Sequence, residues 1–271
     1  MAKSQAKNFY YSFVLLDEPR KKAMCAVYAF MRYCDDLSDD LGLANRKEAL
    51  ENWQKDLTAA LDSSRDGGGE AVPDHPLWPA FLDTVSRFAI PHEYFYEMIE
   101  GVSSDVEPRQ IETFDELYQY CYQVASVVGM TVIHIFGFED PRALGLAEKC
   151  GIAFQLTNIM RDIREDEAMG RRYLPAEELE RFHVAKFEYT PEFFVFMRFQ
   201  GQRAQLYYDE SRELLELVDP KCRASLWALI EIYRRLLQKI NSSGYRVLDG
   251  RIRLTTMQKL AVVAQAFLKR R

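Results

Sequence analysis

Two short runs of acidic side chains at helical spacing constrain this chain most. In the first, residues 155–175, Gln155, Asn158, Asp162 and Asp166 follow at intervals of three or four, so on a helix they share one stripe. Like charges at this spacing weaken an isolated helix by a few tenths of a kcal/mol, which favours a compensating cation. Carboxylate and amide oxygens without Cys or His suit Mg2+. An acidic, exposed helix end is the alternative explanation.

A second run, residues 30–40, is built in the same way. Asp35 and Asp39 again stand four residues apart, and Arg32 lies one turn before Asp36. In a helical bundle, facing helices can bring two such stripes together around one cavity, as in known bundle metal sites. The two runs therefore predict two acidic rims that hold several Mg2+ ions against one diphosphate.

Composition supports one all-α domain spanning residues 1–271. The chain is 48% hydrophobic, with only 13 Gly and 10 Pro, and its length suffices for a core and a pocket. A net charge of -6 argues against non-specific nucleic-acid binding. Five scattered cysteines and the polar start of the chain, which lacks a signal-peptide core, indicate a reducing, cytoplasmic location.

Apolar periodicity and helix start signals predict a series of helices. We expect one from Asp17-Glu18-Pro19 to about Asp39, and a long one from Phe114 to about Phe136 that contains several small residues. The other expected helices cover residues 44–62, 77–88, 91–104, 142–164, 191–217, 220–242 and 255–271. Residues 171–190 read as irregular with one short helix, a segment that could cover the metal site.

Both acidic runs resemble the motifs of the squalene and phytoene synthase family, the head-to-head prenyl transferases. The first family motif appears as Asp35-Asp36-Leu37-Ser38-Asp39, preceded by Tyr28-Ala29-Phe30 and Arg32. The second runs from Asn158 through Asp162 and Asp166 to Arg172-Tyr173-Leu174-Pro175. Order, spacing and flanking residues all fit. The resemblance implies an isoprenoid-synthase helical bundle with a central cavity for prenyl chains.

The resemblance also implies roles for individual residues. The implied metal ligands are Asp35, Asp36, Asp39, Asn158, Asp162 and Asp166. Tyr120 and Tyr173 are the implied catalytic hydroxyls, and the substrate-binding residues are Arg32, Arg171, Tyr233, Arg251, Gln155, Phe9, Phe13 and Tyr28. Aromatic faces such as Phe9, Phe13 and Tyr28 can stabilise a carbocation by cation-π attraction, although each is also an ordinary core residue type.

The expected reaction is a Mg2+-dependent condensation of two prenyl diphosphates to a cyclopropylcarbinyl diphosphate. We favour two farnesyl diphosphates giving presqualene diphosphate, or a later product on the way to squalene. The alternative within the family is a phytoene synthase that uses geranylgeranyl diphosphate. NADPH use stays open, since relatives that use it lack a dinucleotide fingerprint.

Two other classes remain open. A non-catalytic helical assembly factor would keep the fold but lose the aspartates, which this chain retains. A cyclising terpene synthase would carry Asn-Ser-Glu type ligands in its second motif. The final Lys269-Arg270-Arg271 suits the helix macrodipole, or a loose contact with an anionic membrane surface.

Overall fold

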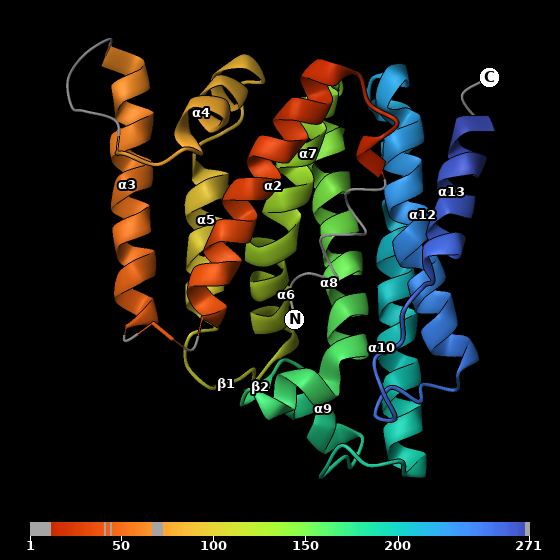
Figure 1. The fold of residues 1–271 in the computed structure, drawn as a ribbon. Coiled ribbons are helices and arrows are strands. Elements are labelled where there is room, and N and C mark those ends of the chain that lie inside the picture. Colours follow the sequence, from red (N-terminus) through yellow and green to blue (C-terminus); the bar gives the residue numbers. More distant parts are fainter. Residues whose placement is uncertain (1–11, 41, 44, 67–72, 269–271) are drawn as a thin grey trace.

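The computed structural model describes residues 12–40, 42–43, 45–66 and 73–268. Helices dominate this part of the chain (Figure 1). The helices are α2 (Glu18–Asp39), α3 (Arg46–Asp66), α4 (Trp78–Arg87), α5 (Glu93–Ser103), α6 (Phe114–Cys121), the π-helix η1 (Tyr122–Ser126), α7 (Val127–Phe136), α8 (Arg142–Ala168), α9 (Ala176–Arg181), α10 (Pro191–Glu210), α11 (Leu214–Leu217), α12 (Pro220–Ser242) and α13 (Thr256–Leu268). The predicted all-α bundle is confirmed.

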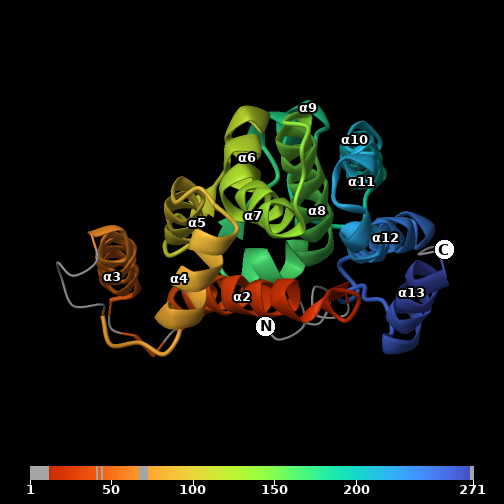
Figure 2. The ribbon, with the colours of Figure 1, turned by 90° about the horizontal axis from the view of Figure 1, so that it is seen from above.

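Helix α8 lies at the centre of the bundle. It packs against η1, α7, α10 and α12, while α2 contacts α3, α4, α5 and α7. Seen from above, α3 and α13 form the two ends of the assembly (Figure 2). The two acidic runs fall on α2 and α8, so the bundle can place them around one space.

Local sequence signals explain where several helices begin. Asp17 caps α2 by accepting a hydrogen bond from the Arg20 backbone N–H, at 3.0 Å. Thr113, Thr190 and Asp219 cap α6, α10 and α12 in the same manner. Proline occupies the first turn of α2, α10 and α12, where its missing N–H costs no helix bond.

The structure departs from the predicted helices at two places. The expected helix over 191–217 is interrupted after α10, where the Ser211 hydroxyl donates to the Tyr208 carbonyl and replaces the regular pattern. The expected helix over 114–136 is continuous but contains the π-helical turn η1. Small residues allow α8 to approach this turn closely, because a Cβ on Gly151 would lie 2.5 Å from the Ser126 Cα.

A short parallel strand pair was not predicted. Strand β1 (Arg109–Gln110) pairs with β2 (Arg171–Arg172), directly after α8 ends. Gly170 makes the reversal between α8 and β2 with a φ of +74°, a left-handed conformation that favours glycine. The pair ties Arg171 to the segment that follows α5. None of the described helices has the length and apolar character needed to cross a bilayer.

Candidate active site

A cavity of about 300 Å3 lies between α2, α5, α7, α8 and α12, a size typical of small-molecule sites. Most of the predicted site residues line it: Phe13, Tyr28, Arg32, Asp35, Asp39, Tyr120, Gln155, Asn158, Asp162, Asp166, Arg171, Tyr173, Tyr233 and Arg251. Asp36 is not among the lining residues, and Phe9 falls outside the described residues. Residues more than 200 positions apart in sequence therefore share one space.

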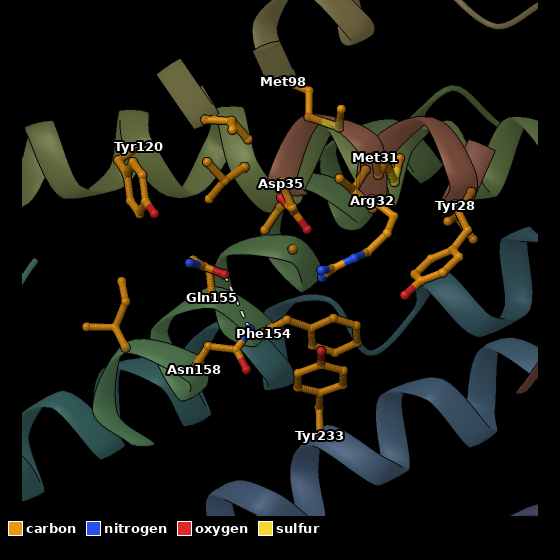
Figure 3. A pocket seen from close by; sticks show the side chains of 18 of the residues that line it. Tyr28, Met31, Arg32, Asp35, Met98, Tyr120, Phe154, Gln155, Asn158 and Tyr233 are labelled. Carbon is orange, nitrogen blue, oxygen red and sulfur yellow. Dashed lines mark hydrogen bonds between the residues drawn. The ribbon is translucent and has the colours of Figure 1, made fainter. Parts of the chain in front are cut away.

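The first acidic rim is the last two turns of α2. Asp35 points from this helix into the cavity, and Arg32 reaches into it from one turn earlier (Figure 3). Burial raises the pKa of Asp35 to about 7, an effect that Arg32 opposes and Asp39 increases. Asp36 lies outside and forms an ion pair with Arg32. Asp35 and Asp39 therefore line the cavity, while Asp36 orients Arg32.

The second rim is the C-terminal half of α8. Asp162 is 7% exposed and is held by two guanidinium groups, those of Arg161 on the same helix and Arg251 near the end of the chain. Arg251 binds it through two bonds, Nε to Oδ1 at 2.7 Å and Nη2 to Oδ2 at 2.8 Å. Burial, and after it the neighbouring Asp162 charge, raise the pKa of Asp166 to about 8.

Asn158 contributes an amide to the same rim. Its side-chain N–H donates to Gln155 at 3.3 Å (Figure 3), but its Oδ1 is buried and has no hydrogen-bond partner among the residues that the structure describes. A buried oxygen without a hydrogen bond lowers the stability of the folded state by about 1–3 kcal/mol, so a ligand that binds this atom would recover that free energy. Asn158 lines the cavity, so its amide is a candidate ligand for a bound cation.

Arg171 bridges the two sides of the cavity mouth. Its Nε donates to the Asp105 backbone carbonyl at 3.0 Å, and its Nη2 lies 3.4 Å from Asp39 Oδ1. The guanidinium is buried, and the β1–β2 pair fixes its backbone. A rigid cation beside two acidic rims is well placed for a phosphate group.

Two stacked tyrosines stand beside this arginine. The rings of Tyr120 and Tyr173 are 4.6 Å apart and tilted by only 17°. Tyr120 donates its hydroxyl hydrogen to Asp105 Oδ2 at 2.7 Å, and burial raises the pKa of Tyr120 well above its ordinary value. Both hydroxyl groups therefore keep their protons at neutral pH and act as hydrogen-bond donors.

The rest of the cavity is apolar. Aliphatic and aromatic groups from α2, α7 and α12 line it, including Val27, Val128, Val132 and Leu226. The predicted diphosphate neighbour Tyr233 stacks on Phe154, with centroids 4.2 Å apart and planes at 9° (Figure 3). Gly129 also lines the cavity, in agreement with the prediction that small residues make room there. The end of the cavity with the acidic rims therefore suits charged groups, and the apolar end suits hydrocarbon chains.

The donor set fits Mg2+ in chemistry. The described residues contain no group of three His, Cys, Asp or Glu side chains close enough to enclose an ion by themselves. Mg2+ does not require such a cage, since it commonly binds one or two carboxylates together with waters and substrate phosphates. The partnerless Asn158 oxygen and the crowded carboxylates Asp35 and Asp166 match this mode.

Comparison with known proteins assigns the family. The squalene/phytoene synthase model matches residues 2–258. The chain belongs to the squalene/phytoene synthase family. It is 32% identical to 15-cis-phytoene synthase of Synechococcus elongatus, over 97% of this chain and 89% of that protein. It is also 32% identical to phytoene synthase 1 of Arabidopsis thaliana, over 97% of this chain but only 64% of the plant protein.

Solved structures place the fold in the same squalene/phytoene synthase family. A dehydrosqualene synthase crystallised with a ligand superposes with a TM-score of 0.87 and 30% identity, covering 98% of this chain and 93% of that one. The family consists of prenyl transferases, which confirms the expected class of enzyme. The phytoene synthase relatives fit the alternative with a C20 substrate at least as well as the favoured C15 reaction.

Two residues with specific contacts in the synthase cavity were not among those predicted from the sequence. Asp105 was not among the predicted site residues, yet it lines the cavity and its carboxylate accepts the hydroxyl hydrogen of Tyr120. Phe154 was not singled out, because a lone aromatic on a helix gives no signal beyond core packing. Its position one residue before Gln155, on the helix of the second rim, is the feature that could have indicated it.

Proposed function

We propose that the chain catalyses a Mg2+-dependent head-to-head condensation of two allylic prenyl diphosphates. One observation carries the proposal: carboxylates from α2 and α8 lie at the same end of a cavity whose remainder is apolar. A diphosphate with its metal ions suits the acidic end, and two hydrocarbon chains suit the apolar end. The retained carboxylates also argue against a non-catalytic assembly factor.

The proposed metal ligands are Asp35, Asp39, Asp162, Asp166 and Asn158, which all line the cavity, whereas Asp36 pairs with Arg32. When bound, Mg2+ neutralises the charge that develops on the departing diphosphate. Asp35 and Asp39 come from one helix and the other three cavity ligands from another, so a bound diphosphate would draw the two rims together.

Arginines and tyrosines complete the polar end. Arg32, Arg171 and Arg251 would donate charge-assisted hydrogen bonds to diphosphate oxygens. Tyr173, which stays protonated, would donate to the leaving group, while Tyr120, whose hydroxyl hydrogen goes to Asp105, would help to orient it. Around the hydrocarbon, Phe13, Tyr28, Phe154 and Tyr233 would exclude water and stabilise the allylic cation by about 1–2 kcal/mol per well-placed ring.

We place geranylgeranyl diphosphate first as substrate, on the names of the phytoene synthase relatives. Farnesyl diphosphate is the second candidate, supported by the likeness to a dehydrosqualene synthase. The first product is a cyclopropylcarbinyl diphosphate in either case. Continuation to a hydrocarbon requires loss of the remaining diphosphate, after which the carbocation loses a proton, or takes up hydride if NADPH is used. We propose a cytoplasmic protein that meets its lipid substrates and product at a membrane surface.

Product analysis tests this function. The purified protein is incubated with C15 or C20 prenyl diphosphate, with Mg2+ or EDTA and with or without NADPH, and products are identified by mass spectrometry. We expect a C40 product from the C20 substrate, lost with EDTA and restored by Mg2+. A C30 product alone would identify farnesyl diphosphate as the substrate. If neither substrate is turned over, the non-catalytic assembly factor becomes the favoured alternative.

A further inference from the structure

Helix α13 is apolar on two opposite faces. One face packs against α12, where Val262 and Ala266 are fully buried. The other face is open to solvent and carries Met257, Leu260, Phe267 and Leu268, which are 75%, 46%, 61% and 73% exposed. We call these four residues the α13 stripe. Ala261 and Ala264 fall between them at the same helical spacing and are exposed too.

This exposure is concentrated rather than scattered. Of the nine large apolar side chains that are exposed in the described part of the chain, four form the α13 stripe, on a helix of 13 residues. Single exposed apolar residues are normal on a protein surface, whereas contiguous ones mark a contact site. The helix lies at one end of the bundle, accessible from outside (Figures 1 and 2).

The charged residues in the chain segment that carries the stripe are all basic. After Asp249 the sequence contains no acidic residue, although the whole chain has a net charge of -6. The basic residues there, apart from Arg251 in the cavity, are Arg253, Lys259, Lys269, Arg270 and Arg271. An exposed apolar stripe flanked by Lys and Arg is typical of helices that lie in a lipid interface.

One helix lies between α13 and the apolar end of the cavity, on the side of α13 opposite to the stripe. Helix α12 separates them: Leu226 and Leu229 line the cavity, while Ala224, Ala228 and Ile232 pack towards α13. The turn before α2 completes this wall. Within it, Phe13 lines the cavity, Leu15 joins the α13 contact, and Val14 between them is 62% exposed.

We propose that the α13 stripe docks this protein onto an anionic lipid bilayer, with α13 lying in the plane of the interface. The choice of a lipid surface rests in part on the proposed function, whose hydrocarbon product must leave the apolar cavity. A second copy of the chain fits less well, because a two-fold contact would bring the same basic residues face to face. At about 20 Å, α13 is too short to span the ~30 Å hydrocarbon core.

Vesicle co-sedimentation tests the docking face without any substrate. We expect the full chain to sediment with phosphatidylglycerol/phosphatidylcholine vesicles, and less with phosphatidylcholine alone. A variant with Met257→Gln, Leu260→Gln, Phe267→Gln and Leu268→Gln should bind at least about tenfold more weakly. Val195→Gln with Leu206→Gln on α10 is the matched control, since these residues are 51% and 56% exposed and should leave binding unchanged.

A second variant keeps the test independent of helix packing. Lys269→Glu, Arg270→Glu and Arg271→Glu should lower the partition coefficient by roughly fivefold or more per residue at low salt. The circular dichroism spectrum of each variant, and its turnover in detergent solution, should match those of the unmodified protein. If the unmodified protein shows no turnover, the proposed reaction is wrong, but the vesicle result still tests the docking face. The proposal is overturned if the unmodified chain does not sediment with anionic vesicles, or if both variants bind these vesicles as strongly as the unmodified chain does. A dimer that the stripe variant dissociates, seen by light scattering, would also overturn it.

Discussion

The guanidinium of Arg251 holds the carboxylate of Asp162 through two hydrogen bonds of 2.7 and 2.8 Å, although 89 residues separate them. The same carboxylate is held by Arg161, so a predicted metal ligand is fully engaged by two cations. Binding of Mg2+ and diphosphate would exchange one partner of Asp162 for a metal ion and give Arg251 a phosphate oxygen.

Arg251→Ala should therefore lower the rate by on the order of 100-fold to 1000-fold, as expected for the loss of one electrostatic stabiliser. Arg251→Lys should restore little, because an ammonium group cannot form the two-pronged contact. Steady-state kinetics with the prenyl diphosphate measure both. Arg246→Ala, at a nearby arginine paired with exposed Asp249, is the control and should cost less than about threefold. Equal losses at both positions would contradict a specific role for Arg251.

Asp35→Asn should reduce turnover by about 100-fold or more while the helical circular dichroism spectrum is retained. The physical reason is the loss of a negative ligand in the cavity wall, with almost no change in side-chain volume. Isothermal titration with Mg2+ and a non-reactive diphosphate analogue should show weaker binding. Asp62→Asn on exposed α3 is the matched control. Full activity of Asp35→Asn would remove this residue from the metal site.

Asp105 and Tyr120 should act as a pair. Loss of the Tyr120 hydroxyl in Tyr120→Phe, or of its acceptor in Asp105→Leu, should lower turnover about tenfold to a hundredfold and raise the share of cyclopropylcarbinyl diphosphate among the products. Asp105→Asn keeps an acceptor oxygen and should be milder. The double variant Tyr120→Phe/Asp105→Leu should be little worse than either single one. Additive losses would show that the two residues act separately.

The stability of the metal-free protein should fall as pH rises from about 4 to 8. Asp35 and Asp166 have pKa values raised from 3.8 to about 7 and about 8, so the folded state binds their protons more tightly than the unfolded state does. Their stabilising contribution is complete below about pH 4 and is lost as pH passes through the folded-state pKa values. Thermal unfolding with EDTA measures it.

Two comparisons isolate these carboxyl groups. Asp35→Asn/Asp166→Asn should flatten the decline of Tm with pH, and Mg2+ should raise Tm more at pH 8.5 than at pH 5.5. A metal-free Tm that increases between pH 5 and 8, with no change in slope for the variant, would be the opposite result.

Gly151→Ala should destabilise the fold by about 1–3 kcal/mol, because the added methyl group would meet the backbone of η1 at 2.5 Å. Gly145→Ala on the same helix provides the contrast: its Cβ meets nothing within 4 Å, so it should stabilise by about 0.5–1 kcal/mol. Chemical denaturation gives both values. Similar changes in the two variants would mean that η1 and α8 are not tightly packed.

The rims and most helices could be predicted because their signals are local. Asp35 and Asp39, or Asn158 and Asp162, are one turn apart, so periodicity alone places each pair on one face. The relation between the rims could not be read in this way, and it came from the family resemblance. Contacts such as Tyr120 with Asp105, or Arg171 with Asp39, depend on how distant segments pack, and they leave no spacing pattern in the chain.

The same limit explains the π-helical turn and the break after Glu210. Both replace regular backbone bonds by alternatives that only tertiary packing decides, such as the close approach of Gly151 to Ser126. Asp105 was not predicted as a site residue for a related reason, since a single acidic residue just after a helix is usually solvent-exposed.

The π-helical turn from Tyr122 to Ser126 has a consequence for how this chain can change over evolutionary time. Such a turn holds one extra residue, which rotates everything beyond it by about 100° relative to a regular α-helix. Tyr120 before the turn and Val128 and Val132 after it face the same cavity only with that offset. A regular α-helix formed by the same residues would turn the hydrocarbon-facing wall away by about 100°. Deletion of a single residue here would instead give a regular helix whose two ends keep their orientation, so this turn is where the helix could lose a residue without moving the cavity wall.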